Sequence, residues 1–175
     1  MEENDEYKFD RIPVKHLVSK RDIGIEVFEL IDGNMMLEAT FIDPYHLIRL
    51  NIQIIPDTRT IIAAKSEYTN YPHSLCKSLT NKAKLLVGLQ ITRGITKEVL
   101  KIMGGCDGCV HLRELVLETI NFAATVLIGY NAGFGLMSRE FNIQDENIKF
   151  ELSKNLLKNT CFDYKQKQLC ILFDN

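Results

Sequence analysis

The sequence has no tryptophan, few prolines and no apolar run long enough to cross a membrane. A membrane-spanning helix needs roughly 20 consecutive apolar residues, and the most apolar stretch, around residues 112–130, is interrupted by Glu118 and Asn121. The N-terminal segment Met1–Glu6 is acidic, whereas a secretion signal starts with basic residues and continues with an apolar segment. These features predict a cytoplasmic protein with no membrane partner.

An excess of positive charge is also missing. Lysine and arginine number 21 against 23 aspartates and glutamates, which gives a formal net charge of -2. The lysines are scattered along the chain, while nucleic acids and anionic lipids attract clustered positive charge. No nucleic-acid partner is therefore expected, and a protein partner or a second copy of the chain stays open.

Length and composition predict a single domain. A chain of 175 residues, 46% hydrophobic and 25% charged, can bury a core of its own. Residues 1–10 are too polar to join that core, so we predict that they form a flexible acidic tail. Residues 11–175 are predicted to form one α+β domain.

The first half of this domain has the periodicity of strands. Segments 25–31 and 35–42 flank Asp32-Gly33-Asn34, a sequence typical of a hairpin turn. Apolar residues then alternate strictly with polar ones over 48–54, and segment 60–68 is also rich in strand formers. This pattern predicts an N-terminal antiparallel β-meander of three to four strands.

The second half has helical periodicity over segments 75–86, 96–103 and 112–130. The meander is expected to pack on this C-terminal helical half, with one apolar strand face against one apolar helix stripe. The strand face consists of Ile48, Leu50, Ile52 and Ile54. The helix stripe consists of Leu112, Leu115, Val116, Phe122, Ala123, Val126 and Leu127.

The cysteines indicate chemistry. The chain has five of them, an odd number, and cytoplasmic cysteines usually stay reduced, so metal binding or thiol chemistry is favoured over disulfides. Three glycines and two cysteines lie in residues 104–109, directly before the longest helical segment. A tight turn there would present thiols to a helix N-terminus, which stabilises thiolates.

We predict from this pattern that Cys76 and Cys109 converge on one metal site, which Cys161 and either His111 or Cys106 complete. Cys76 is predicted in the first turn of its helix, as Cys109 is in the first turn of the long one. Soft sulfur ligands favour zinc, iron or an iron–sulfur cluster over magnesium or calcium. The alternative is that the cysteines are buried packing residues, which is common for cysteine.

A second function class is an enzyme in which Cys109 is the nucleophile and the substrate is a small acyl compound or thioester. On a helix, His111 would point about 200° away from Cys109, so His73 or His16 is the expected base. A third class is a binding module with structural cysteines only. The C-x-x-C spacing of Cys106 and Cys109 does not favour a thioredoxin-like oxidoreductase, because the preceding segment is helical.

The motif Gly104-Gly105-x-x-Gly108-Cys109-x-His111-Leu112-x-Glu114-Leu115 resembles that of an uncharacterised bacterial family, catalogued as a domain of unknown function. The resemblance covers most of the chain. This sequence has Val110 where the family usually has threonine, and it has the additional Cys106. The resemblance implies a shared fold and site, and it implies no activity.

A fainter resemblance is to iron–sulfur scaffold proteins of the NifU type. In those proteins a meander also leads into a helical half, with one cysteine just after the sheet and another at the start of the last long helix. Cys76 and Cys109 lie at matching places. The remaining scaffold cysteine lies in the first hairpin, where this chain has Asp32-Gly33-Asn34. The resemblance implies a NifU-like fold and cluster binding.

Overall fold

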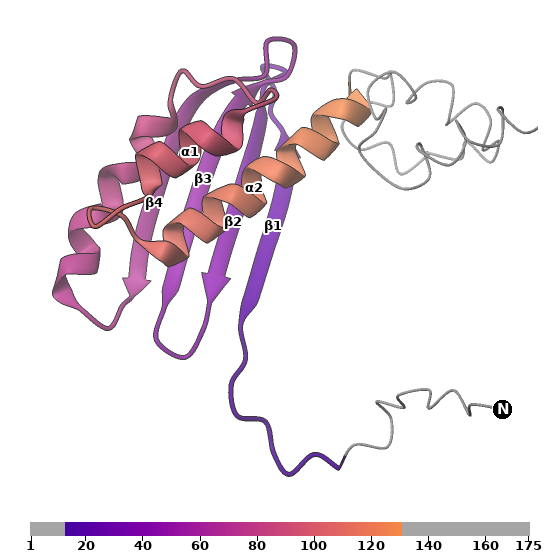
Figure 1. Ribbon diagram of the computed structural model, residues 1–175. Coiled ribbons are helices and arrows are strands. Elements are labelled where there is room, and N and C mark those ends of the chain that lie inside the picture. The colour runs from indigo at the N-terminus through magenta and orange to yellow at the C-terminus, as the bar shows by residue number, and fades with distance from the viewer. Residues whose placement is uncertain (1–12, 131–175) are drawn as a thin grey trace, which may run out of the picture.

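A four-stranded antiparallel sheet forms one layer of the protein, and helices cover one of its faces (Figure 1). The computed structural model describes residues 13–130. The strands are β1 (Asp22–Glu29), β2 (Met35–Ile42), β3 (Leu47–Ile55) and β4 (Thr60–Asn70), and they are ordered in space as in the sequence. The predicted α+β class and the N-terminal meander, with its fourth strand, are confirmed.

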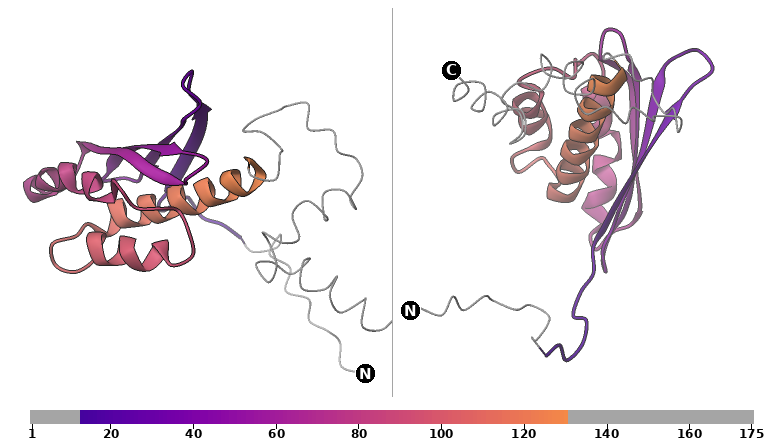
Figure 2. Two further views of the ribbon diagram at one scale, coloured as in Figure 1. Left: turned by 90° about the horizontal axis from the view of Figure 1, so that it is seen from above. Right: turned by 90° about the vertical axis from the view of Figure 1, so that its right-hand side faces the viewer.

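Within residues 13–130, three helical segments follow the sheet: the 3-10 helix η2 (Ser74–Leu86), α1 (Ile95–Met103) and α2 (Val110–Gly129). All three lie on the same side of the sheet (Figure 2). The long helix α2 packs across β1, β2 and β3, while η2 packs against β4 and α1 contacts both other helices. The predicted helical segment 75–86 is therefore helical, with tighter winding than an α-helix.

The core lies between the sheet and the helices. The predicted strand face is confirmed, since Ile48, Leu50, Ile52 and Ile54 are each at most 1% exposed. On α2 the buried residues recur at helical spacing: Leu112, Leu115, Val116, Thr119, Ile120, Ala123 and Leu127. Five of the seven predicted residues belong to this set. Phe122 and the partly buried Val126 do not, and Thr119 and Ile120 are buried in addition.

Phe122 was predicted to be buried on α2 and is 43% exposed. It precedes the buried Ala123 by one residue, which turns its side chain by about 100° around the helix axis and away from the sheet. Thr119 is polar and yet lies on the buried stripe. Its hydroxyl can be buried because it donates a hydrogen bond to the carbonyl oxygen of Leu115 at 2.7 Å. The polar group is thereby satisfied within the helix itself.

Several predictions concern residues outside the described part of the chain. The tail of residues 1–10 lies there, as do Cys161 and the rest of the domain beyond residue 130. The single domain over 11–175 stays a prediction. Within residues 13–130, none of the helices combines the length and the apolar character that crossing a membrane requires.

Candidate functional site

The turn between α1 and α2 is as tight as its glycines suggest. Gly105 has a φ of 72°, which L-residues with side chains rarely adopt. A Cβ on Gly108 would lie 2.0 Å from the carbonyl oxygen of Met103, so the chain passes directly over the end of α1. This close passage fixes where α2 begins and therefore where Cys109 lies.

Cys109 is the N-cap residue of α2, with an extended backbone at φ -116° and ψ 122°. Its Sγ accepts a hydrogen bond from the backbone N–H of Leu112 at 3.5 Å. The thiol thus takes the place that a serine or aspartate oxygen holds at most helix starts. Positive charge from the helix dipole also favours an anion here.

This geometry corrects the predicted relation between Cys109 and His111. The prediction that His111 points about 200° away assumed that both residues lie on the helix. Because the backbone of Cys109 is extended, its Sγ turns back toward the helix and lies 4.0 Å from Nδ1 of His111. Among the described residues, the imidazole in contact with the Cys109 thiol is that of His111. His73 and His16, the predicted bases, are both exposed.

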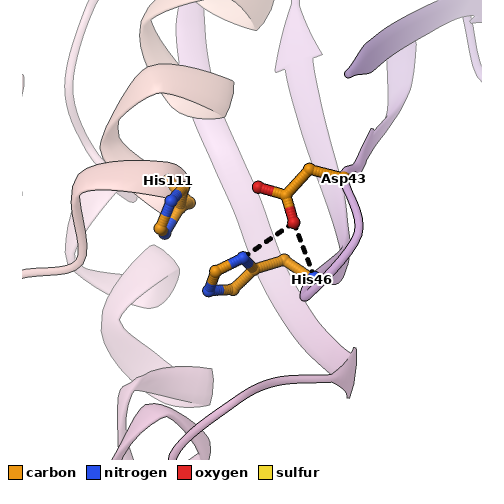
Figure 3. A group of neighbouring side chains, drawn as sticks. All are labelled: Asp43, His46 and His111. Carbon is orange, nitrogen blue, oxygen red and sulfur yellow. Dashed lines mark hydrogen bonds and ion pairs between the residues drawn. The ribbon is translucent and has the colours of Figure 1, made fainter. Parts of the chain in front are cut away.

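Asp43 organises the turn between β2 and β3. Its Oδ1 accepts hydrogen bonds from the backbone N–H groups of Tyr45 at 2.9 Å and His46 at 2.7 Å, and it lies 2.9 Å from Nδ1 of His46 (Figure 3). Burial alone would raise the pKa of Asp43, but these hydrogen bonds lower it below its usual value. An ionised carboxylate can only accept, so Nδ1 of His46 is the donor, and in the neutral form of the ring Nε2 is the acceptor.

The two histidines meet at this point, one from the β2–β3 turn and one from the first turn of α2 (Figure 3). Their ring centroids are 3.9 Å apart with an interplanar angle of 35°, and the ring of Phe41 lies edge-on to His111 at 5.3 Å. One ligand atom from each of Asp43, His46 and His111 can be chosen so that all lie within 4.8 Å of one another. We call these three residues the Asp–His–His cluster.

Burial lowers the pKa of His111, and the neighbouring His46 lowers it further. A neutral imidazole is the form that binds metal ions or accepts a proton. At neutral pH, His111 is therefore in the form that either chemistry requires.

Arg21 connects three parts of the structure beside the Asp–His–His cluster. Its guanidinium Cζ lies 4.9 Å from the ring centroid of Phe41. One nitrogen pairs with the carboxylate of Glu114 on α2 at 3.1 Å, and another lies 3.7 Å from Oδ2 of Asp43. The arginine therefore holds the segment before β1, the β2–β3 turn and α2 in a fixed relation.

A cleft of about 740 Å³ opens beside the Asp–His–His cluster. Its walls come from the β2–β3 turn, the start of η2 and the turn before α2. The lining residues include His46, His73, Cys76, Cys106, Cys109 and His111. Four of the five residues predicted to form a metal site thus line one cleft, and the fifth, Cys161, lies outside the described residues.

The hydroxyl of Tyr68 on β4 is also buried. The residue is 7% exposed, and its Oη has no hydrogen-bond partner of ordinary geometry among the described residues. Burial raises the pKa of Tyr68 above its usual range, and the thiols of Cys109 and Cys76 raise it further. Both thiols are therefore close enough to influence the ionisation of this hydroxyl.

Sequence reasoning did not identify Asp43, His46 or Tyr68 as site residues. Asp43 and His46 follow a strand at a turn, where aspartate commonly caps the backbone, and this was the available signal. The sequence around Tyr68 contains no such signal, since a tyrosine that alternates with polar residues is typical of an ordinary strand. The contact between His46 and His111 joins segments far apart in the chain, which periodicity cannot reveal.

The fold and site together define an α+β protein with an Asp–His–His cluster beside a thiol-lined cleft. The chain belongs to the family described as "Protein of unknown function (DUF2889)", whose model matches residues 19–125. This match runs from just before β1 into α2 and contains the whole cluster, so the predicted family is confirmed. No curated protein and no solved structure matches the chain. The likeness to NifU-type scaffolds therefore has no support from these comparisons.

Proposed function

We propose that this protein binds a divalent transition-metal ion, such as zinc or ferrous iron, at the Asp–His–His cluster, with the Cys109 thiolate as a further ligand. The observation that carries the proposal is the proximity of three ligand atoms, all within 4.8 Å, contributed by two separate elements of the fold. Folding alone brings these side chains together. The surrounding cleft leaves the site accessible to an ion.

The pairing of Asp43 with His46 supports this proposal. Metal-binding histidines usually donate their second ring N–H to a carboxylate, which fixes the tautomer and turns the other nitrogen to the ion. Nδ1 of His46 lies 2.9 Å from Oδ1 of Asp43, so Nε2 is left for coordination. Asp43 then orients a ligand, or binds through its second oxygen.

The distances are close to those of a four-coordinate site. In a tetrahedral zinc site, a sulfur and a nitrogen ligand are about 3.5 Å apart, compared with 4.0 Å between Sγ of Cys109 and Nδ1 of His111. The stacked imidazoles must turn so that their lone pairs converge, because those lone pairs lie in the ring planes. Imidazole with thiolate suits zinc or iron, while clusters are generally held by thiolates alone. A single ion is therefore favoured over an iron–sulfur cluster.

Metal analysis of protein purified without oxygen tests this proposal. We expect about one zinc or iron ion per chain in the wild type, and a loss of most of it in His46→Ala and His111→Ala. His73→Ala is the matched control, because His73 lines the same cleft outside the cluster and should leave the metal content unchanged. Equal metal content in all four proteins, or a wild type that takes up no metal, contradicts the proposal.

A second candidate function is catalysis by Cys109 on a small acyl compound or thioester. The 4.0 Å approach of His111 to its sulfur favours this candidate, because the histidine can take the thiol proton. With a thioester, Sγ would attack the carbonyl carbon, a new C–S bond would form, and the thiolate of the substrate would leave. The N–H groups at the start of α2 would face the oxygen that becomes negative.

The two candidates differ in their need for metal. If Cys109 is a nucleophile, chelator-treated protein should still hydrolyse a short acyl thioester, and Cys109→Ser should reduce the rate by about a hundredfold or more. Cys106→Ser is the control, since Cys106 is exposed on the same cleft. Equal rates in the wild type and Cys109→Ser would exclude catalysis by this thiol.

A further inference from the structure

The unpaired hydroxyl of Tyr68 points to an additional feature of the site. Buried polar groups almost always have a hydrogen-bond partner, yet no ordinary partner reaches Oη among the described residues. Leaving such a group unpaired costs free energy. A partner that becomes a strong hydrogen-bond acceptor only when a metal ion is bound would account for the unpaired hydroxyl.

The sulfur atoms of Cys76 and Cys109 are the candidates for that partner. Tyr68 lies near the end of β4, Cys76 lies in the first turn of η2, and Cys109 caps α2. Both thiols line the same cleft, and both act electrostatically on the Tyr68 hydroxyl. Two thiols from different elements therefore line the cleft beside the Asp–His–His cluster, and both influence the buried hydroxyl of Tyr68.

We propose that Cys76 and Cys109 bind a thiophilic ion as a pair of thiolates and that Tyr68 donates an O–H···S hydrogen bond to the Cys109 sulfur in that state. This inference rests on the proposed metal binding and specifies its ligands and its ion class. A metal-bound thiolate is a better acceptor than a neutral thiol, because it keeps negative charge. Tyr68 is then a positioning residue that acts through a ligand. The site should prefer zinc, cadmium or cobalt over manganese or magnesium.

Cobalt-loaded protein provides the test, since thiolate ligands give a sulfur-to-cobalt charge-transfer absorption that imidazole and carboxylate ligands lack. We expect this absorption in the wild type. Each of the single variants Cys76→Ser and Cys109→Ser should show about half its intensity. In Tyr68→Phe the cobalt content should persist, while the band shifts and the affinity for cadmium falls about tenfold. Affinity for manganese should stay unchanged, because manganese does not depend on the thiolates.

Tyr71→Phe is the matched control, because Tyr71 is half-buried against the core and does not line the cleft, so this variant should leave both the band and the cadmium affinity unchanged. Thermal unfolding of both tyrosine variants checks that they fold. A spectrum and cadmium affinity of Tyr68→Phe that equal those of the wild type overturn the role of Tyr68. Cobalt binding without any charge-transfer absorption overturns the thiolate pair, and with it Cys109 as a ligand, and leaves Asp43, His46 and His111 as the metal ligands. A wild type that binds no cobalt overturns both.

Discussion

His111 is the residue on which the site depends most. It contacts the Cys109 thiol on one side and the His46 ring on another, and Phe41 lies against its edge. Charged groups of both signs also face it, since Arg21 and His46 lower its pKa while Asp43 and Glu114 raise it. Burial is the largest influence, and the net direction is downward.

This lowered pKa makes the stability of the metal-free protein depend on pH. Above about pH 6.5, the ordinary histidine pKa, His111 is neutral in the folded and unfolded states, and no stability is lost. As the pH falls below that value, the unfolded chain binds the proton first, so the free energy of unfolding decreases until the folded pKa is passed. Urea unfolding of chelator-treated protein between about pH 8 and about pH 5 measures this effect.

Replacing the titrating group is the control for this pH dependence. His111→Gln should flatten the decrease in unfolding free energy, whereas His16→Gln should not, because His16 is exposed outside the sheet and helices. If the wild type and His111→Gln lose the same stability over this range, the pH dependence comes from other groups.

At the scale of elements, the start of α2 shows what the sequence could predict. The glycines of residues 104–108 and the long apolar period after them correctly predict a tight turn followed by a helix. The exact first residue decides which side chains face each other, since each residue turns a helix by about 100°. Cap positions are uncertain by one or two residues in sequence reasoning, and that uncertainty produced the wrong relation between Cys109 and His111.

Gly108→Ala tests the importance of this turn. Its Cβ would lie 2.0 Å from the Met103 carbonyl oxygen and 3.0 Å from that of Gly104, and neither is a flexible side chain. We expect a loss of about 3 kcal/mol in the free energy of unfolding and, because Cys109 and His111 follow the turn directly, weaker metal binding. Chemical denaturation and metal titration measure these two effects.

Gly24→Ala is the matched control, because a Cβ there meets nothing within 4 Å and alanine suits a strand better than glycine does. The unfolding free energy of this variant should equal or slightly exceed that of the wild type. A Gly108→Ala protein as stable as Gly24→Ala would show that the turn tolerates a side chain.

At the scale of the whole molecule, the sheet and its helical layer were predictable, whereas the contacts across them were not. Strand alternation over 48–54 and the helical stripe of α2 each follow from local periodicity. The Asp–His–His cluster instead requires that the β2–β3 turn and the first turn of α2 meet at the same end of the sheet. That meeting depends on how α2 crosses the strands, which no local pattern encodes.

The packing of α2 on the sheet should therefore control both stability and the site. Leu115 is fully buried on the face of α2 that meets the sheet, and Leu115→Asp would place an unpaired charge there. The expected cost of about 3 to 5 kcal/mol is a large part of the roughly 5 to 15 kcal/mol that stabilises a typical domain. We expect Leu115→Asp to unfold, with loss of helical circular dichroism and of metal binding together.

Asn121→Asp introduces the same charge on the exposed side of the same helix, so it should fold and bind metal as the wild type does. Comparison of the two variants separates the effect of burial from the effect of charge. Both introduce an aspartate into the same helix, and both change the net charge by the same amount. A soluble Leu115→Asp protein with wild-type thermal stability would mean that α2 does not pack on this sheet. The cluster could not then form, since the sheet and α2 each contribute only part of it.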